Sequence, residues 1–283
     1  MLNEYVYIIK CILLNWQFLQ NMNYRVRFFA AVKAAFIHLL CSLALALLAG
    51  ILVFSLWYPY PYRELSGGRE LFLLVMAVDV VCGPLLMLVL FNPAKPLTEL
   101  WRDLGLVVLI QLGALGYGLW TVWQARPLFL VVELERLKVV SAPDLRLATD
   151  PLAAAALANL PASLKPRWFE GPTIVALRES KNEEEATKVM IDYTLGGRDF
   201  SDRPEFYIKY DDAISLKSLQ KAKPLMIFLQ KQPGQQSAAE KLAAEKGADI
   251  AEWVYLPIAA RQDWVAVLNK KGKIEGFLRG KGI

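Results

Sequence analysis

The chain has 283 residues, of which 55% are hydrophobic, and its formal net charge is +5. The first 126 residues carry nine Lys or Arg and six Asp or Glu, which leaves twenty-three and twenty-one for the remainder, so neither part is basic enough to indicate nucleic-acid binding. The apolar residues are concentrated before Arg126, which indicates a membrane protein with a soluble tail.

Residues 1–21 form an N-terminal extension. Its apolar stretch, Tyr5 to Leu19, is interrupted by Lys10 and Asn15 and is too poor to span a bilayer comfortably. Two interpretations stay open: an amphipathic helix at the membrane interface, or upstream sequence before a working start at Met22. The second is favoured because the family resemblance described below begins just after Met22.

The first convincing span runs from about Ala34 to Leu56. It ends in the aromatic, proline-rich run Trp57–Tyr62, and such aromatic residues mark a membrane interface. No small-residue cleavage site follows, so we expect an uncleaved anchor. The small residues Ser42, Ala46 and Gly50 recur every fourth position, which gives one thin face for another helix to approach.

The second span, Leu71 to Phe91, carries one carboxylate, Asp79, close to its middle. A charge at that depth costs at least ~2.5 kcal/mol, so it needs a structural or functional reason. Gly83 lies one turn later on the same helix face, and Pro84 removes a backbone donor, which predicts a kink. A carboxylate and a thin patch of backbone are therefore expected together inside the membrane.

The third span, about Leu104 to Trp123, is rich in small residues, with Ala114 and Gly118 again four apart. Gln111 lies at depth in this span, and His38, the single histidine of the chain, lies near the charged end of the first. We interpret His38 as a hydrogen-bond partner of a neighbouring helix; a proton relay with the carboxylate of the second span is the alternative.

The distribution of Lys and Arg predicts the orientation of this membrane region, residues 22–126. Five basic residues would lie inside, and three flank the outer ends of the spans, so the N-terminus is expected inside. Three spans put the two ends of the chain on opposite sides, and the tail, residues 127–283, is expected outside. The inner group is Arg25, Arg27, Lys33, Lys95 and Arg102, and the outer group is Arg63, Arg69 and Arg126.

The tail has the size of one domain, and its pattern predicts a soluble α+β domain after three transmembrane α-helices. Ser237 and Glu240 have the spacing of a capping box, Gly247 supplies a helix stop, and Gly272 suits the left-handed position of a hairpin turn. Strands are predicted at Leu128–Val140, Pro172–Leu177, Pro224–Leu229, Trp264–Leu268 and Ile274–Leu278. Helices are predicted at Leu152–Ala158, Glu183–Tyr193 and Ala238–Lys246.

The tail sequence contains no histidine and no cysteine. This excludes a Ser-His-Asp triad, a thiol nucleophile and the usual zinc ligands there, and the chain has no phosphate-binding loop. We therefore predict no catalytic residue, no metal site and no cofactor. A binding or assembly role is left.

Ordered motifs run through the three spans: Phe36–Ser42, Trp57–Pro59, Gly67–Leu71, Asp79–Leu85, Phe91–Pro93, Tyr117–Trp120 and Ala125–Pro127. A weaker set in the tail consists of Tyr255, Leu256, Pro257, Arg261, Asp263 and Trp264. Together these motifs resemble the TfpX/TfpZ family of type IV pilin accessory proteins. That family is implicated in bringing the major pilin stably to the surface as assembled pili, and it is regarded as non-enzymatic and inner-membrane.

The resemblance implies a bacterial inner-membrane protein with a cytoplasmic N-terminus and a periplasmic tail. Its expected partners are the type IV major pilin, other pilus assembly components and the lipid bilayer. In this interpretation Asp79, Gly83 and Pro84 receive the apolar pilin helix beside the thin faces of the neighbouring spans. The alternative is that Asp79 hydrogen-bonds Gln111 or His38 and fixes packing.

Two other classes stay open. A membrane-anchored sensor or ligand-binding module would need a deep polar pocket in the tail, whereas a flat apolar patch would favour pilin binding. A membrane enzyme that modifies pilin, such as a glycan transferase, would need charged catalytic groups at the outer interface. The candidates there are Arg63, Glu64, Arg69 and Glu70.

Overall fold

The computed structural model describes the backbone of residues 2–282, and side chains for the same residues apart from 2–23, 212 and 213. Two compact units divide the chain. The helical unit is Met1–Ile51 with Phe72–Trp120, and the sheet unit is Leu52–Leu71 with Thr121–Ile283. The segment Leu52–Leu71, here called the connector, runs from the end of the first span to the start of the second in sequence, and it groups with the tail.

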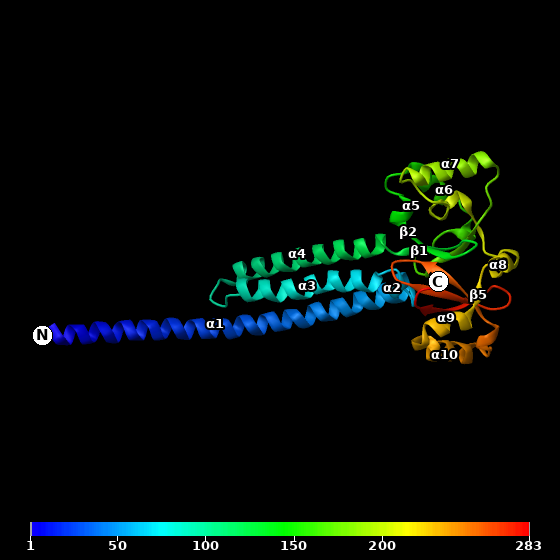
Figure 1. Ribbon diagram of the computed structural model, residues 1–283. Coiled ribbons are helices and arrows are strands. Elements are labelled where there is room, and N and C mark those ends of the chain that lie inside the picture. The colour runs from blue at the N-terminus through cyan, green and yellow to red at the C-terminus, as the bar shows by residue number, and fades with distance from the viewer. Residues whose placement is uncertain (1, 283) are drawn as a thin grey trace. The chain divides into compact units, whose positions relative to one another are not determined.

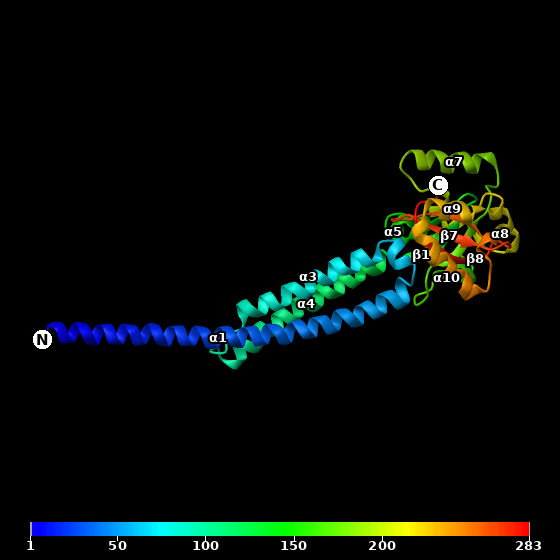
Figure 2. The ribbon, with the colours of Figure 1, turned by 60° about the horizontal axis from the view of Figure 1, so that its bottom comes forward.

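Three helices are long and apolar enough to cross a membrane: Tyr24–Trp57, Gly68–Leu90 and Leu97–Gln124. This confirms the three predicted spans. The first and third helices extend beyond the predicted range at both ends, whereas the second begins earlier and ends at Leu90, one residue before the predicted end. Within the helical unit α1, α3 and α4 run alongside one another (Figures 1 and 2). The helices are α1 (Leu2–Leu52), continued by a π-helical turn (Val53–Trp57), α3 (Gly68–Leu90) and α4 (Leu97–Gln124).

Two sequence predictions concern the course of these helices. α3 stays helical through Pro84, as a membrane helix can when neighbouring groups satisfy the freed carbonyl. The backbone of residues 2–21 continues α1, but the side chains of residues 2–23 lie outside the described part of the chain. Both interpretations of the N-terminal extension therefore stay predictions.

The tail forms a mixed sheet of eight strands in the order β4-β3-β1-β2-β6-β7-β8, with β5 paired to β6. Most neighbours are antiparallel; β1 with β3 and β2 with β6 are parallel. The β2–β6 pairing is short and joins the two halves of the sheet. The strands are β1 (Pro127–Val132), β2 (Leu137–Ser141), β3 (Thr173–Leu177), β4 (Tyr207–Lys209), β5 (Lys223–Pro224), β6 (Val254–Ala259), β7 (Trp264–Leu268) and β8 (Ile274–Arg279).

Short helices cover this sheet, and Figure 1 shows α9 and α10 beside each other next to the C-terminal strands. The α-helices of the sheet unit are α2 (Tyr62–Leu65), α5 (Ala142–Leu145), α6 (Pro151–Ala158), α7 (Glu183–Thr194), α8 (Asp212–Leu219), α9 (Leu225–Lys231) and α10 (Gln236–Lys246). The 3₁₀ turns are Ala162–Leu164, Phe200–Asp202, Pro204–Phe206, Pro233–Gln235 and Ile250–Glu252.

The predicted soluble α+β domain is confirmed, and so is the terminal hairpin of β7 and β8. Gly247 and Gly272 adopt the left-handed conformation, with φ of 61° and 74°, as the helix stop and the turn require. The single predicted strand Leu128–Val140 is instead a hairpin, because the chain turns between Glu133 and Arg136 and pairs β1 with β2.

Two local predictions were wrong. The apolar run Pro224–Leu229 is mainly helix α9, because Leu225, Phe228 and Leu229 have helical spacing and are all buried on one face. The capping box of Ser237 and Glu240 does not form, because α10 begins at Gln236 directly after a 3₁₀ turn. The Glu240 carboxylate instead accepts a hydrogen bond of 2.8 Å from the Gln236 side chain.

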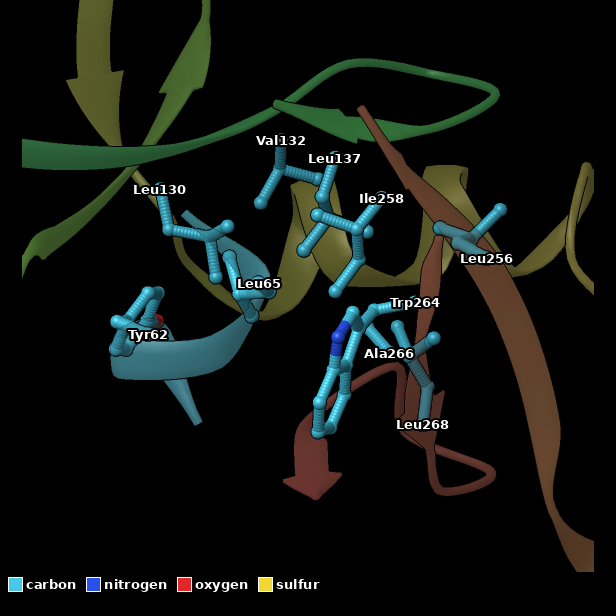
Figure 3. Close-up of a cluster of buried hydrophobic side chains, with 10 residues drawn as sticks. All are labelled: Tyr62, Leu65, Leu130, Val132, Leu137, Leu256, Ile258, Trp264, Ala266 and Leu268. Carbon is cyan, nitrogen blue, oxygen red and sulfur yellow. The ribbon is translucent and has the colours of Figure 1, made fainter. Parts of the chain in front are cut away.

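The connector completes the main core of the sheet unit. Tyr62 and Leu65 of α2 pack against strands of both halves of the sheet (Figure 3). Leu65 has no exposed surface. The strand residues of this cluster are Leu130, Val132, Leu137, Leu256, Ile258, Trp264, Ala266 and Leu268.

Candidate functional site

The first region that carries the sequence motifs is the connector, and its buried side chains are packed inside the sheet unit. Tyr58 is buried, and its hydroxyl donates a 3.0 Å hydrogen bond to the main-chain oxygen of Val122. A Cβ at Gly68 would overlap the Tyr58 ring, so this glycine is required by close approach rather than by a turn. Burial raises the pKa of the Tyr58 phenol. The connector is therefore built as a packed structural element.

The weaker tail motif receives this connector. The main-chain N–H of Gln262 donates to the oxygen of Leu65 at 3.0 Å, and its side-chain amide donates to the Glu70 carboxylate at 2.8 Å. Gly67 has a φ of 76°, and a Cβ there would lie 2.5 Å from Cδ of Arg261. The ring of Trp264 lies 6.1 Å from that of Tyr60, edge to face.

The other members of the tail motif have internal roles. Tyr255 is buried and its ring lies 5.5 Å from Phe228. Pro257 pairs with Val265 in the ladder of β6 and β7, and the main-chain oxygen of Asp263 accepts a 2.9 Å bond from Gly280. The arrangement of the tail motif thus fits holding the connector and the sheet together.

The second motif-bearing region lies among the three spans. Nε2 of His38 is in hydrogen-bond contact with Oε1 of Gln111, and Nε2 of Gln111 donates to the main-chain oxygen of Asp79 at 3.1 Å. One chain of polar contacts therefore links α1, α4 and α3. A Cβ at Gly83 would overlap the Gln111 amide and lie 2.7 Å from Nε2 of His38, so Gly83 provides the space for this contact.

The Asp79 carboxylate is not used in that chain of contacts. The residue Asp79 lines a cavity of about 400 Å³ together with His38, Ser42 and Gln111. Among the described residues no hydrogen bond or ion pair to this carboxylate is found. Apolar side chains form the rest of the lining, and several of them, such as Ile37 and Leu112, are exposed on the helix surface. We call this open cavity the intramembrane cleft.

The small residues of the spans divide between the interior and the surface of the helical unit. A Cβ at Gly118 would overlap a methyl group of Val75, and one at Gly50 would lie 3.3 Å from the ring of Phe72. Both glycines therefore allow close contact with α3. The remaining predicted positions differ in exposure: Ser42 is buried, Ala46 and Pro84 are half-buried, and Ala114 is exposed.

A groove in the sheet unit was not predicted from the sequence. Its volume is about 830 Å³, and apolar side chains such as Leu177 and Ile208 alternate in its lining with charged ones. Arg178, at its edge, donates two hydrogen bonds to the Glu185 carboxylate, at 2.7 and 2.8 Å, which lowers the pKa of Glu185 to about 2. The lining residues come from β1, β3, β4, α8 and the loops beside them, and the sequence signal for such a distributed set is weak.

The sequence also did not predict a cluster of aromatic rings at the ends of the first and third spans. Trp123, near the end of α4, packs edge to face on Trp57 at 4.8 Å and against Trp168 at 5.2 Å, and the guanidinium of Arg126 lies 3.2 Å above its ring. Trp57 and Trp123 were recognisable from the sequence as residues at span ends. Trp168 lies in a loop of the tail, and nothing in its local sequence predicts that contact.

The groups considered for a membrane enzyme have surface contacts. Arg63 lies 5.5 Å above the ring of Tyr60, and Glu70 accepts the bond from Gln262 described above. Among the residues whose side chains the structure describes, no group of three His, Cys, Asp or Glu is placed to hold a metal ion. These contacts give no arrangement of a nucleophile with a base.

These features define a membrane protein with three spans whose connector and tail fold into one α+β unit. Comparison with known proteins then identifies the family. The profile described as "Fimbrial assembly protein FimB" matches residues 26–67, which cover the first span and most of the connector. A "Fimbrial assembly protein, serogroup I" from Dichelobacter nodosus is 34% identical over 251 residues, which are 88% of this chain and 94% of that relative. The chain belongs to the fimbrial assembly protein (FimB) family.

Further similar proteins are also fimbrial assembly proteins. The serogroup E1 protein of the same organism is also 34% identical over 251 residues, 88% of this chain and 94% of its own length. The protein of serogroups C1 and C2 is 42% identical over 127 residues, 45% of this chain and 97% of its own length. No solved structure matches. The family is of the same general kind as the pilin accessory family that the motifs resemble.

Proposed function

We propose that this chain is a non-enzymatic accessory protein of type IV fimbriae that binds the major pilin in the bacterial inner membrane. It keeps the pilin stable and promotes its assembly or surface display, with the N-terminus in the cytoplasm and the sheet unit in the periplasm. Membership in a fimbrial assembly family supports this proposal. The three apolar helices support a position in the membrane, and a pilin waits there before assembly.

The observation that carries the binding step is the intramembrane cleft. A pilin presents a long apolar N-terminal helix, and a cleft lined mainly by apolar side chains offers such a helix a lateral site. Asp79 lines this cleft and its carboxylate accepts no hydrogen bond from the described residues, so it can pair with a polar or charged group of the incoming helix.

The pilin head would meet the sheet unit. Helix α7 and its C-terminal residue expose a run of large apolar side chains, and exposed apolar patches mark protein interaction sites. The flat surface of a helix suits a globular head better than a small molecule. The exposed side chains are Met190, Ile191, Tyr193 and Leu195.

Site-specific photo-crosslinking in cells tests the cleft. A photoreactive residue at Leu112, which lines the cleft, is expected to trap pilin. The same residue at Leu109, which is exposed on the same helix but does not line the cleft, is the matched control. Equal yields from both positions, or no pilin adduct from Leu112, would contradict the proposed site.

The charge of Asp79 is tested separately. Asp79→Asn keeps the main-chain oxygen that Gln111 uses, so the packing of the spans should be retained. Co-purification with pilin and surface piliation are expected to fall together. If co-purification and piliation both stay at the level of the unmodified protein, the proposed pairing through the carboxylate is wrong. The crosslinking experiment then still tests whether pilin binds in the cleft.

The groove of the sheet unit supports a second candidate, a membrane-anchored ligand-binding module. Its volume of about 830 Å³ and its mixed lining fit a small polar ligand. A screen of periplasmic small molecules for a rise in the unfolding temperature of the full chain tests this candidate. The rise must disappear in Ile208→Trp, which fills the groove, and persist in Ile191→Trp on α7 outside it.

A further inference from the structure

The loop that joins the 3₁₀ turn Ala162–Leu164 to β3 exposes two adjacent aromatic side chains. Trp168 and Phe169 are each 68% exposed. Large apolar side chains gain free energy by leaving water, and two of them side by side on a loop form an apolar patch. The neighbouring Leu164 is buried in the core, so the loop is held by its base while its tip projects.

The contacts of this loop place it beside the ends of two spans. Trp168 packs against Trp123, the next-to-last residue of the third span, at 5.2 Å. The ring of Trp57, the last residue of the first span, lies 4.8 Å from the same Trp123 ring. At the end of the loop a Cβ on Gly171 would lie 2.9 Å from the ring of Pro59, two residues beyond the first span.

These contacts indicate the depth at which we expect the loop tip in the bilayer. Trp57 and Trp123 end apolar helices, and tryptophan at such ends lies at the level of the lipid headgroups. Trp168 touches one of them directly and therefore lies at that level too. Phe169 follows it in sequence and is equally exposed. The exposed pair thus continues the aromatic belt of the spans.

The charges of the loop suit the same surface. Lys165 and Arg167 are exposed on either side of Pro166, and Arg126 lies two residues beyond the third span. Burial against Trp123 lowers the pKa of Arg126 to about 10. Arg167 also pairs with Glu170 at 2.6 Å. Basic side chains beside exposed aromatic ones are typical of segments that bind anionic lipid headgroups.

We propose that the loop of residues 165–171 is a membrane-interface anchor. Trp168 and Phe169 insert among the lipid headgroups next to the ends of the first and third spans, with Lys165 and Arg167 at the level of the lipid phosphates. The occupant of this aromatic patch is the bilayer itself. The anchor holds the sheet unit against the membrane surface independently of any fimbrial partner.

Spin-label accessibility in liposomes tests the proposal. The full chain, with Cys11, Cys41 and Cys82 changed to Ala, receives a nitroxide at Phe169→Cys and is reconstituted into vesicles of phosphatidylethanolamine and phosphatidylglycerol. Collision rates with molecular oxygen, which concentrates in lipid, are compared with those of a water-soluble nickel chelate. The matched control is Leu195→Cys, an 82% exposed apolar position at the end of α7.

The ratio of oxygen to nickel collisions is expected to be at least about threefold higher at position 169 than at position 195, because an interfacial side chain is shielded from the aqueous reagent. Equal ratios at the two positions would overturn the proposal. So would a low ratio at position 169 in liposomes that rises when purified pilin is added, since the patch would then be a protein-binding site. Phe169 is exposed, so its replacement leaves the loop contacts of Trp168 and Gly171 in place.

Discussion

The two motif-bearing regions of this protein use their distinctive residues in opposite ways. In the connector, Tyr58, Tyr62 and Leu65 are buried, and their partners lie in the same unit. In the intramembrane cleft, Asp79 and His38 are half-buried and border an open cavity. Both regions carry sequence motifs, but the connector is packed into its own unit, whereas Asp79 lines an open cavity and its carboxylate accepts no hydrogen bond from the described residues.

The difference separates residues needed for folding from residues available for binding. A water-exposed unit can be held by burial of large apolar side chains, as the core around Leu65 is. Spans in lipid lack that driving force and associate through small residues and polar contacts. The helical unit contains both kinds of contact, at Gly118 and at Gln111. The carboxylate of Asp79 takes part in neither of these contacts, and for this reason we propose it as the group that pairs with an incoming helix.

The largest expected effect comes from breaking the closed region. Leu65→Ala removes a side chain with no exposed surface from the main core. Such truncations cost about 2 to 5 kcal/mol, so a clear fall in the unfolding temperature of the sheet unit is expected. Differential scanning fluorimetry in detergent measures it. Leu134→Ala, at an exposed position, should change little, and a similar fall in both variants would show that Leu65 has no special role.

The next effect concerns close contact between α3 and α4. Gly118→Ala places a methyl group where a methyl of Val75 lies, and overpacking of this kind costs roughly 1 to 3 kcal/mol. An SDS titration followed by circular dichroism is expected to show earlier unfolding of the helical unit. At Gly113 an added Cβ meets nothing within 4 Å, so Gly113→Ala is the control. Equal shifts would place the effect in lipid or detergent packing rather than at Val75.

A smaller effect is expected from the polar contacts of the cleft. Gln111→Leu removes the bonds to His38 and to the main chain of Asp79. Hydrogen bonds between membrane helices average about 0.6 kcal/mol, so a modest shift is expected in the same SDS titration. Asp79→Asn should not shift the titration, because the main-chain acceptor remains. A larger shift for Asp79→Asn than for Gln111→Leu would mean that the carboxylate is structural.

The smallest effect concerns acid stability of the sheet unit. The hydrogen bonds from Arg178 lower the pKa of Glu185 from 4.5 to about 2 in the folded chain. A lowered pKa means that the stabilisation is fully present above pH 4.5 and is lost as the pH falls toward 2. Glu185→Gln should therefore lower the unfolding temperature at pH 7 and converge with the unmodified protein near pH 2. Glu184→Gln, at an exposed position on the same helix, should follow the unmodified protein at every pH.

The sequence was sufficient for the features that depend on local pattern. Long apolar runs predicted the three spans, and Gly247 and Gly272 predicted a helix stop and a turn because their conformations are locally determined. The run Pro224–Leu229 misled because a short apolar stretch fits a strand and a buried helix equally well. The packing of Tyr62 and Leu65 into the tail could not be predicted, since it depends on strands far away in sequence.

For the candidate site, the sequence indicated which polar groups share the membrane but not how they pair. Gln111 could have bonded the carboxylate of Asp79, and the structure instead uses its main-chain oxygen. Which oxygen of Asp79 Gln111 meets depends on the rotation of α4 against α3, and α4 approaches α3 closely where Gly118 faces Val75. A four-residue spacing of small residues shows that close approach is possible and does not specify the partner.

The burial of the connector has a consequence for biosynthesis. Tyr62 and Leu65 leave the ribosome early, but the strands that cover them include β7, which is made near the end of translation. Until β7 is made, these two large apolar side chains cannot be buried, and the nascent chain is a substrate for chaperones and proteases. A chain in which one of the two later spans failed to insert would leave connector and tail on opposite faces of the membrane. Such a chain could not complete the core around Leu65, so a folded sheet unit would require both later spans to be inserted.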